Sequence, residues 1–591
     1  MIALKLQPNG QLSQLGMLCV VLLALIVRIH AIDHESLFMD ELHQVSYYLN
    51  SPSEIIQLAA NQQQPPLDYW IGHYISKISY SDFFVRLPAA LFGTGAVALL
   101  MLIVARLTAW PLAIGAGVAM ALMPFPVYFS QEARPYSIAI FFVLFLLWRL
   151  DKYLQAEKGL LGNLGVFFLA LLGLLLSRTL SPLVFVVCLL AVLILFSFLM
   201  RMNKLGMPAG LKTKLPLAVL AIVAALLLYL PILLNILEKG SRYARQPTHV
   251  GISTLFEGFS KLDLVPLWQA YITQLEPVGL ILLPLLIGVP FAIGRNKHLK
   301  KDPFALSLLL LLPSASLLHL FVFQAKTDWP FRPPYPVYLL PLSIILSAIC
   351  LQQVLDVIKV QWGRVHFYTV FLLGVLMLGL LGYTLLDFKT WPKRSDWKGL
   401  ANYLAASYGK ETLLVFDGLV PADGWEPTFY GFPRYYKGVS DRMPASLVVE
   451  YTNEIATKNY KPVLIWFYYH DYYLTRHSSY PFIPAFEKTV DYSGLFKDSS
   501  LNVKPFTGFL VVELYNSSGN GLSDMSHLLN QVLADVKPGD QVLDTLVAAA
   551  AVDKKLGLMS WKNHIATARH IMAKGREQEI FNITQYIEEN L

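Results

Sequence analysis

A stretch of acidic and imidazole side chains, HESLFMDELHQ, covers residues 34–44 and follows the first apolar run of the chain. It contains His34, Glu35, Asp40, Glu41 and His43. A carboxylate held in a partly water-excluded cleft can take the proton of a hydroxyl group while that hydroxyl attacks a substrate. The adjacent acids therefore predict a catalytic pair, in which Asp40 is the base and Glu41 tunes it, orients the acceptor or forms an ion pair.

The same acidic stretch could instead begin a helix or bind a metal. Asp is preferred at the start of a helix, and Glu in the first turn suits the positive end of the helix dipole. His34, Glu35, Asp40 and His43 could also hold a divalent cation, but they do not repeat at a fixed ligand spacing on one helix. A divalent metal is therefore an open but unfavoured alternative, and no cofactor is firmly predicted.

The elements that must position these residues are membrane helices. Of the 591 residues, 55% are hydrophobic and only 15% are charged, which is far from the composition of soluble globular domains. The modest formal charge of +7 comes mostly from loops and does not indicate nucleic-acid binding. All three cysteines, Cys19, Cys188 and Cys350, fall in apolar runs, which argues against a disulfide framework or a zinc site.

Apolar runs long enough to cross a bilayer recur until Asp387 and then stop. We therefore predict a transmembrane domain over 1–387 and a soluble α/β domain over 388–591. Strands are expected at 412–418, 461–469 and 508–516, and helices at 396–409, 444–458 and much of 522–591. The predicted membrane spans number eleven and lie near 15–32, 83–107, 109–129, 136–155, 160–176, 178–200, 215–237, 276–294, 304–324, 335–357 and 366–387.

Basic loops at 201–214 and 295–302 fall on one side of the predicted membrane domain, which the positive-inside rule makes cytoplasmic. The acidic stretch, the turn SQEARPY (130–136) and the soluble domain are then outside. Helices along the interface are expected in the first outer loop, at ELHQVSYYLN and PSEIIQLAA. Cations in the outer loops could hold an anionic ligand or snorkel to lipid phosphates; these are Arg134, Arg242, Arg245 and Arg332.

An ordered set of short motifs accompanies the acidic pair. It consists of Asp40-Glu41, Pro65-Pro66-Leu67, Arg86-Leu87-Pro88 and Gln131-Glu132-Ala133-Arg134-Pro135-Tyr136, with later traces at 331–342 (FRPPYPVYLLPL) and 395–406 (SDWKGLANYLAA). This set resembles the GT-C membrane glycosyltransferases that use polyprenyl-phosphate sugars, such as protein O-mannosyltransferases and the lipid A aminoarabinose transferase. One departure is Gln64, which stands where relatives often have Lys or His before Pro-Pro, and another is Asp68, where an aromatic residue is common.

The resemblance implies an inverting transfer of one sugar from a polyprenyl-phosphate donor to a hydroxyl of an envelope acceptor, which would be lipid A or core saccharide, a glycan or a protein. It implies that Asp40 and Glu41 are catalytic. It places the substrate-binding residues at Arg134, Tyr136, Glu132, Arg86, Gln64 and Arg332. Arg134 would stabilise the departing phosphate, and Tyr136 could bind the phosphate or belong to the aromatic belt. Arg86 could contact the phosphate or form a structural ion pair with the first loop, and the structural role is favoured. A bacterial inner membrane with a periplasmic tail is expected.

A second class of protein, a transporter or flippase, also combines many spans with charged residues. Transporters place ionisable groups near the middle of the membrane and in related halves. Here the charges cluster in outer loops, and the sequence has no internal repeat. A sensor with an exported domain would leave the motifs at residues 39–41 and 131–136 without a purpose, so the sequence favours the transferase.

Overall fold

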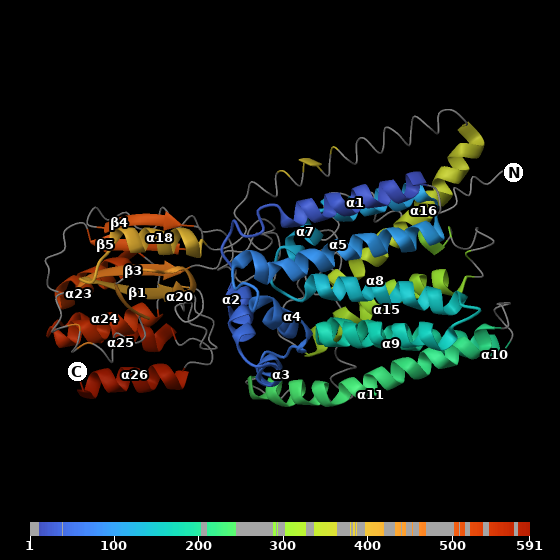
Figure 1. Ribbon diagram of the computed structural model, residues 1–591. Helices are drawn as coiled ribbons and strands as arrows, with labels where there is room; N and C mark the ends of the chain where they lie inside the picture. The colour runs from blue at the N-terminus through green and yellow to red at the C-terminus, as the bar shows by residue number, and fades with distance from the viewer. Residues whose placement is uncertain are drawn as a thin grey trace. The chain divides into compact units, whose positions relative to one another are not determined.

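In the computed structural model the chain forms two compact units (Figure 1). The membrane unit comprises Met1–Asp33 and Gln44–Thr390, and the C-terminal unit comprises His34–His43 and Trp391–Leu591. The described residues are 11–37, 39–202, 210–243, 302–326, 336–362, 396–418, 432–438, 440–444, 460–467, 501–506, 509–514, 521–535, 543–571 and 577–590, with short pieces at 288–290 and 382–383 and single residues at 292, 299, 379, 386, 452 and 455.

Long apolar helices lie side by side in the membrane unit, and the short helices α3 and α4 gather at one end of the bundle (Figure 1). The helices are α1 (Gln11–Ile29), α2 (Met39–Ser46), η1 (Tyr47–Leu49), α3 (Pro52–Asn61), α4 (Leu67–Ser76), α5 (Asp82–Leu107), α6 (Trp110–Leu122), α7 (Pro124–Ser130), α8 (Tyr136–Gln155), α9 (Leu160–Ser177), α10 (Leu180–Arg201), α11 (Leu211–Tyr243), α15 (Pro303–Lys326), η3 (Val337–Leu339) and α16 (Leu340–Trp362).

Six helices of the described residues are long and apolar enough to cross a membrane, and a seventh crossing is possible if the bent pair α6–α7 counts as one. They match the predicted spans at 83–107, 160–176, 178–200, 215–237, 304–324 and 335–357. The predicted span 136–155 is the helix α8, and the predicted span 15–32 overlaps the shorter apolar helix Ser13–Ile29. Most residues of the predicted spans 276–294 and 366–387 lie outside the described residues. The chain is a multi-pass membrane protein.

The predicted span over 109–129 is bent, because α6 and α7 meet at an angle of 60°. Pro124 has no N–H to continue the hydrogen bonds of α6, so the carbonyl of Met120 loses its helical partner. Arg28, fully buried on α1, donates to Met120 O at 3.1 Å and to Ala121 O at 3.3 Å. It also donates from Nε to Ser130 Oγ at 3.2 Å. Arg28 therefore caps the end of α6 and fixes α7.

Close packing of α5 against this corner requires the glycine of the LFGT sequence. A Cβ atom at Gly93 would lie 2.8 Å from Ser130 Cβ and 3.0 Å from Arg28 Nε. Gly93→Ala is therefore expected to destabilise the protein by about 1–3 kcal/mol, as overpacked sites do. Thermal unfolding in detergent would measure this. Gly115→Ala is the matched control, because a Cβ there meets no atom within 4 Å, and an unfolding temperature equal for both variants would contradict the prediction.

The C-terminal unit contains a mixed five-stranded sheet with the order β2-β1-β3-β5-β4. β1 (Thr412–Gly418) pairs in parallel with β2 (Asp441–Pro444) and β3 (Lys461–Phe467), whereas β5 (Phe509–Leu514) pairs antiparallel with β3 and β4 (Leu501–Phe506). The helices are α18 (Trp397–Ser407), α20 (Phe432–Tyr435), α23 (Gly521–Asp535), α24 (Leu543–Lys555), α25 (Ser560–Ile571) and α26 (Glu577–Asn590). The predicted strands at 412–418, 461–469 and 508–516 are confirmed, and most of the predicted helix 444–458 lies outside the described residues.

One hydrophobic core joins this sheet to the C-terminal helices. It contains Leu413, Leu464 and Val512 of the sheet, Leu528 of α23 and Val552 of α24. Figure 1 shows α24, α25 and α26 lying next to one another. Because α24 is built almost wholly of small and β-branched residues over LVAAAAV, it can pack closely on all sides.

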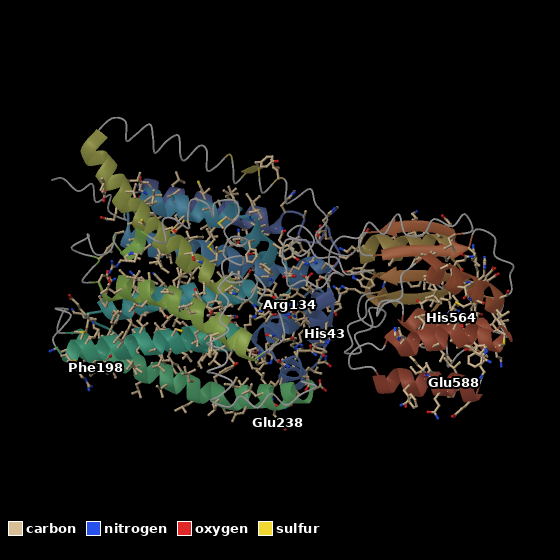
Figure 2. The ribbon with its side chains drawn as sticks, turned by 180° about the vertical axis from the view of Figure 1, so that it is seen from behind. His43, Arg134, Phe198, Glu238, His564 and Glu588 are labelled. Atoms are coloured by element: carbon tan, nitrogen blue, oxygen red, sulfur yellow. The ribbon has the colours of Figure 1, made fainter. Side chains whose placement is uncertain are left out.

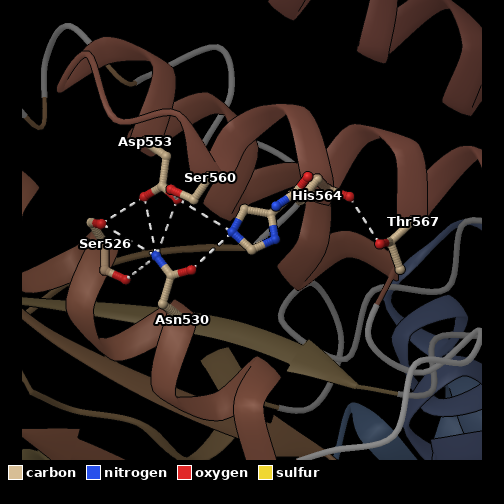
Figure 3. A network of polar contacts seen from close by, with 7 residues as sticks. Ser526, Asn530, Asp553, Ser560, His564 and Thr567 are labelled. Carbon is tan, nitrogen blue, oxygen red and sulfur yellow. Dashed lines mark hydrogen bonds and ion pairs between the residues drawn. The ribbon is translucent and has the colours of Figure 1, made fainter.

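A polar network crosses this helical layer (Figure 3). The fully buried Asp553 accepts hydrogen bonds of 2.6 Å from Ser526 Oγ and Ser560 Oγ, and Asn530 Nδ2 donates to both of its oxygens. His564 Nε2 lies 3.3 Å from Asp553 Oδ2. Burial by itself raises the pKa of Asp553, but the hydrogen bonds from His564, Ser526, Ser560 and Asn530 outweigh it and hold the pKa below its usual value.

A carboxyl with a lowered pKa contributes stability that is present above about pH 4, its unfolded pKa, and is lost as the pH falls toward the folded pKa. We therefore expect Asp553→Asn to lower the free energy of unfolding of the C-terminal unit at pH 7 by about 1–3 kcal/mol. Below about pH 4 the stability of the variant should depend less on pH than that of the wild type. Hydrogen exchange of α23–α25 in the full chain, at pH 7 and at pH 3.5, would measure both. The exposed Glu589, replaced by Gln, is the control; equal exchange in the two variants would contradict the prediction.

Candidate functional site

The acidic stretch is held within the C-terminal unit by two hydrogen bonds. Ser36 Oγ accepts a hydrogen bond of 2.9 Å from the N–H of Lys398, and Leu37 N donates to Tyr435 Oη at 2.9 Å. These contacts fix the loop directly before the helix α2, whose first turn contains Asp40 and Glu41. Asp40 is partly exposed, whereas Glu41 is fully buried. Of the two acids, Asp40 is therefore the one that a substrate can reach.

A buried polar cluster lies in the membrane unit, where α2, η1, α4 and the turn before α8 meet. We call its members Gln44, Tyr48, Asp68 and Arg134 the Gln44 cluster. The amide Nε2 of Gln44 donates to Asp68 Oδ2 and, at 3.1 Å, to Tyr48 Oη. The amide Oε1 of Gln44 accepts a hydrogen bond of 3.0 Å from Arg134 Nη1. Gln44 therefore joins a carboxylate on one side to a guanidinium on the other.

The carboxyl of the Gln44 cluster is in an unusual environment for an acid. Asp68 is 5% exposed and lies in the first turn of α4. Burial raises the pKa of Asp68 to about 6, although the charge of Arg134 and the hydrogen bond from Gln44 both act to lower it. Burial also raises the pKa of the Tyr48 hydroxyl well above its usual value. Tyr48 packs so closely on Gly72 of α4 that a Cβ there would overlap its ring.

The motif Gln131–Tyr136 forms the turn between α7 and α8 together with the first residue of α8. Gln131 Nε2 donates to Arg28 O at 2.9 Å and to His30 O at 3.0 Å, which ties the turn to the end of α1. Glu132 is buried, and its carbonyl accepts from Arg134 N at 2.7 Å. The Arg134 side chain keeps partial exposure. Figure 2 shows Arg134 at one end of the helix bundle, with Phe198 of α10 at the opposite end.

The ring of Tyr136 lies beneath a second cation. Arg178 Cζ lies 4.2 Å from the ring centroid, a distance at which a cation and an aromatic face attract each other. Phe129 packs against the same ring, with centroids 4.5 Å apart. Tyr136 is thus fixed between α7 and the start of the chain segment that leads from α9 to α10.

The remaining predicted site residues are more scattered. Arg86 is fully buried and donates from Nη1 to Ile32 O at 2.8 Å, a contact that fits the structural alternative. Gln64 follows Gln63, whose φ of 55° marks the tight turn before Pro65. The Oε1 atom of Gln64 is buried and accepts no hydrogen bond from any residue placed by the structure. Arg332 and the side chains of Arg242 and Arg245 lie outside the described residues.

Sequence reasoning missed three members of this site. Gln44 was not singled out, although it follows Asp40 by four residues on α2 and so leaves the helix on the same side. Asp68 was noted only as a departure from a family pattern. Arg178 begins a predicted span and gives no sequence signal beyond its charge. Within the described parts of the chain, no group of three or more His, Cys, Asp or Glu side chains could hold a metal ion.

Solved structures resemble this chain in fold, whereas comparisons of sequence find no match. A scan against protein-family models finds no match, and neither does a comparison with curated protein sequences. Among solved structures, ArnT from Cupriavidus metallidurans in the apo state matches with a TM-score of 0.50 and 14% identity, covering 85% of this chain and 98% of that one. ArnT bound to undecaprenyl phosphate matches with a TM-score of 0.47 and 14% identity over 87% and 100% of the two chains.

The archaeal oligosaccharyltransferase AglB from Archaeoglobus fulgidus, in complex with an inhibitory peptide and a dolichol-phosphate, matches with a TM-score of 0.47 and 13% identity, over 78% of this chain and 70% of that one. At such identities the likeness concerns the fold and says nothing of individual residues. The likeness to apo ArnT extends over most of both chains. The chain therefore has the GT-C fold that its sequence motifs predicted.

Proposed function

We propose that the chain is an inverting glycosyltransferase, which moves one monosaccharide from a polyprenyl-phosphate donor to a hydroxyl group of an envelope acceptor. The observation that carries this proposal is Arg134, a partly exposed guanidinium held at one end of a membrane bundle of GT-C fold. A lipid phosphate at a bilayer surface would bring its negative charge to such a place. ArnT, whose fold this chain shares, is also known in a structure bound to undecaprenyl phosphate.

The proposed reaction is a single displacement at the anomeric carbon. The acceptor oxygen forms a bond to that carbon, the bond from the carbon to the phosphate oxygen breaks, and the electron pair leaves with the lipid phosphate. Asp40 takes the proton of the acceptor hydroxyl as the new bond forms. Because attack and departure occur on opposite faces of the sugar, a β-linked donor gives an α-linked product.

Charge stabilisation is the second requirement of this reaction. The leaving phosphate gains negative charge, and a cation placed beforehand at that oxygen lowers the barrier most effectively. Arg134 supplies this charge in the proposal, and Tyr136, two residues later at the start of α8, binds the phosphate. Glu132, Gln64 and Arg332 complete the proposed substrate-binding residues, and Arg86 supports the loop before α2. Glu41, buried beside Asp40, orients or tunes the base.

The proposed acceptor is a lipid A or core saccharide, a glycan or a protein, and the proposed location is a bacterial inner membrane with the C-terminal unit in the periplasm. A transfer assay tests the reaction class. The purified chain is mixed with a sugar-labelled polyprenyl-phosphate fraction and with envelope extract from host cells. We expect label to leave the donor lipid and appear in an acceptor, with unlabelled polyprenyl phosphate as the second product. Label that crosses a vesicle membrane while still attached to its lipid would indicate a flippase and contradict the proposal.

A further inference from the structure

The Gln44 cluster contains a buried acid for which the proposed reaction has no use. Asp68 is almost fully enclosed, in the first turn of α4, where the helix dipole favours negative charge. A buried carboxylate is costly unless hydrogen bonds or a nearby cation compensate it. Here Gln44 supplies a hydrogen bond and Arg134 an opposite charge.

The donor and acceptor atoms of the Gln44 amide determine which end of it faces Asp68 and which end faces Arg134. An ionised carboxylate can only accept hydrogen bonds, so Gln44 must present its Nε2 donor to Asp68. The opposite end of the amide, Oε1, then faces Arg134 Nη1, which can only donate. If Asp68 were absent, the amide could rotate and turn its NH₂ group toward the guanidinium, which would remove this hydrogen bond and place donor against donor.

The charge of Asp68 also polarises the Gln44 amide and so strengthens its hydrogen bond with Arg134. Hydrogen bonds in series polarise one another, so donation from Nε2 to a carboxylate makes Oε1 a stronger acceptor. The fully buried Gln44 is itself held by a second contact, from Nε2 to Tyr48 Oη at 3.1 Å. One edge of the Arg134 guanidinium is thus fixed by a buried amide, while the side chain as a whole remains partly exposed.

We propose that Asp68 is a positioning residue that acts through Gln44 to orient the Arg134 guanidinium toward the phosphate of the donor. This proposal rests on the proposed function, because it takes Arg134 as the phosphate-binding cation. Asp68 itself does not touch the substrate. Its role is to set the orientation of Gln44, and Gln44 in turn sets the orientation of Arg134.

Binding of undecaprenyl phosphate to the purified full chain in nanodiscs tests this relay. We expect Arg134→Ala to weaken binding about tenfold to a hundredfold and Asp68→Asn about tenfold, as the loss of charge-assisted hydrogen bonds does. In the double variant, Asp68→Asn is expected to cost nothing further, because the residue it orients is already gone. Asp151→Asn is the matched control: this aspartate is also buried, but it lies near the far end of α8 and its effect should add to that of Arg134→Ala.

A charge swap makes the test independent of folding defects. In the combination of Asp68→Asn with Gln44→Glu, the new carboxylate at 44 accepts from both the amide at 68 and Arg134. This double variant is expected to recover most of the affinity lost in Asp68→Asn. If Asp68→Asn fails to fold, Gln44→Ala breaks the same relay at its centre and should weaken binding to the same extent.

The outcomes separate the relay from the proposed function. If the wild type binds the probe and Arg134→Ala weakens it, but Asp68→Asn binds normally or adds fully to Arg134→Ala, the relay is wrong and the role of Arg134 stands. If Arg134→Ala binds undecaprenyl phosphate as the wild type does, the phosphate role of Arg134 is wrong, and the relay falls with it.

Discussion

Replacing Asp40 with Asn is expected to lower the rate of sugar transfer about a hundredfold to ten-thousandfold, the usual effect of a positioned acid or base. Asn is nearly isosteric with Asp and keeps an oxygen for the start of α2, so the helix should survive the change. The variant cannot accept the acceptor's proton. The loss should therefore appear in kcat, while binding of the donor lipid changes little.

The matched control for this variant is Asp33→Asn. Asp33 is exposed and lies in the loop before α2, seven residues before Asp40. Its replacement should leave kcat within a factor of about two, as for most surface changes. An Asp40→Asn enzyme with wild-type kcat would mean that the acidic pair only begins a helix, and the base would then have to be sought elsewhere.

Replacing Arg134 with Ala is expected to have an effect of similar size, about a hundredfold to a thousandfold in the rate of transfer. Here the donor lipid should also bind more weakly, because the cation meets the phosphate before and during the reaction. Arg134→Lys should recover only part of the rate. A lysine keeps the charge but lacks the planar fork of donors that can hold Gln44 and a phosphate together.

Arg149→Ala is the control for the arginine variants. Arg149 belongs to α8, the helix that Arg134 precedes, but lies near its other end, where it donates to Asn163 Oδ1 at 2.7 Å. Its loss should alter stability without a specific effect on kcat. Equal activity losses in Arg134→Ala and Arg149→Ala would show that both act through the fold, and Arg134 would lose its proposed role in charge stabilisation.

Much of the fold could be predicted because its signals are local. Apolar runs of sufficient length gave the helices α5, α9 and α10, and apolar stretches bounded by polar residues gave the three inner strands of the sheet. The two edge strands were missed for a physical reason. β2 and β4 are short or mixed in polarity and contain Pro444 and Pro505, and proline is tolerated at a sheet edge because no neighbour requires its N–H.

The bend in the predicted span 109–129 has a sequence signal of its own. Pro124 and Pro126 interrupt this run, and each removes one backbone donor from a continuous helix. No local pattern predicts how the freed carbonyls are satisfied. The donor is a buried arginine of α1, which lies 92 residues earlier in the chain. A membrane helix can break at such a point only because another element satisfies its freed carbonyls.

In the candidate site, too, some residues have a local sequence signal and others have none. The motifs at residues 40–41 and 131–136 were visible as residue types in order, and the comparison with solved structures bears out the GT-C fold that they indicate. The Gln44 cluster was not visible, since its contacts join residues 24 and 90 positions apart. They depend on the packing of η1 against α4, where Tyr48 lies over Gly72. Such contacts arise only once the helices have assembled.

The most direct test of sugar transfer by this chain is the mass profile of envelope lipids, glycans and proteins from cells that lack it. Such cells would be complemented with the wild type or with a well-expressed Asp40→Asn variant. We predict that one sugar-sized mass increment disappears without the protein, returns with the wild type and does not return with Asp40→Asn. That increment would also identify the sugar. A profile unchanged by loss of the protein, or fully restored by Asp40→Asn, would contradict the account.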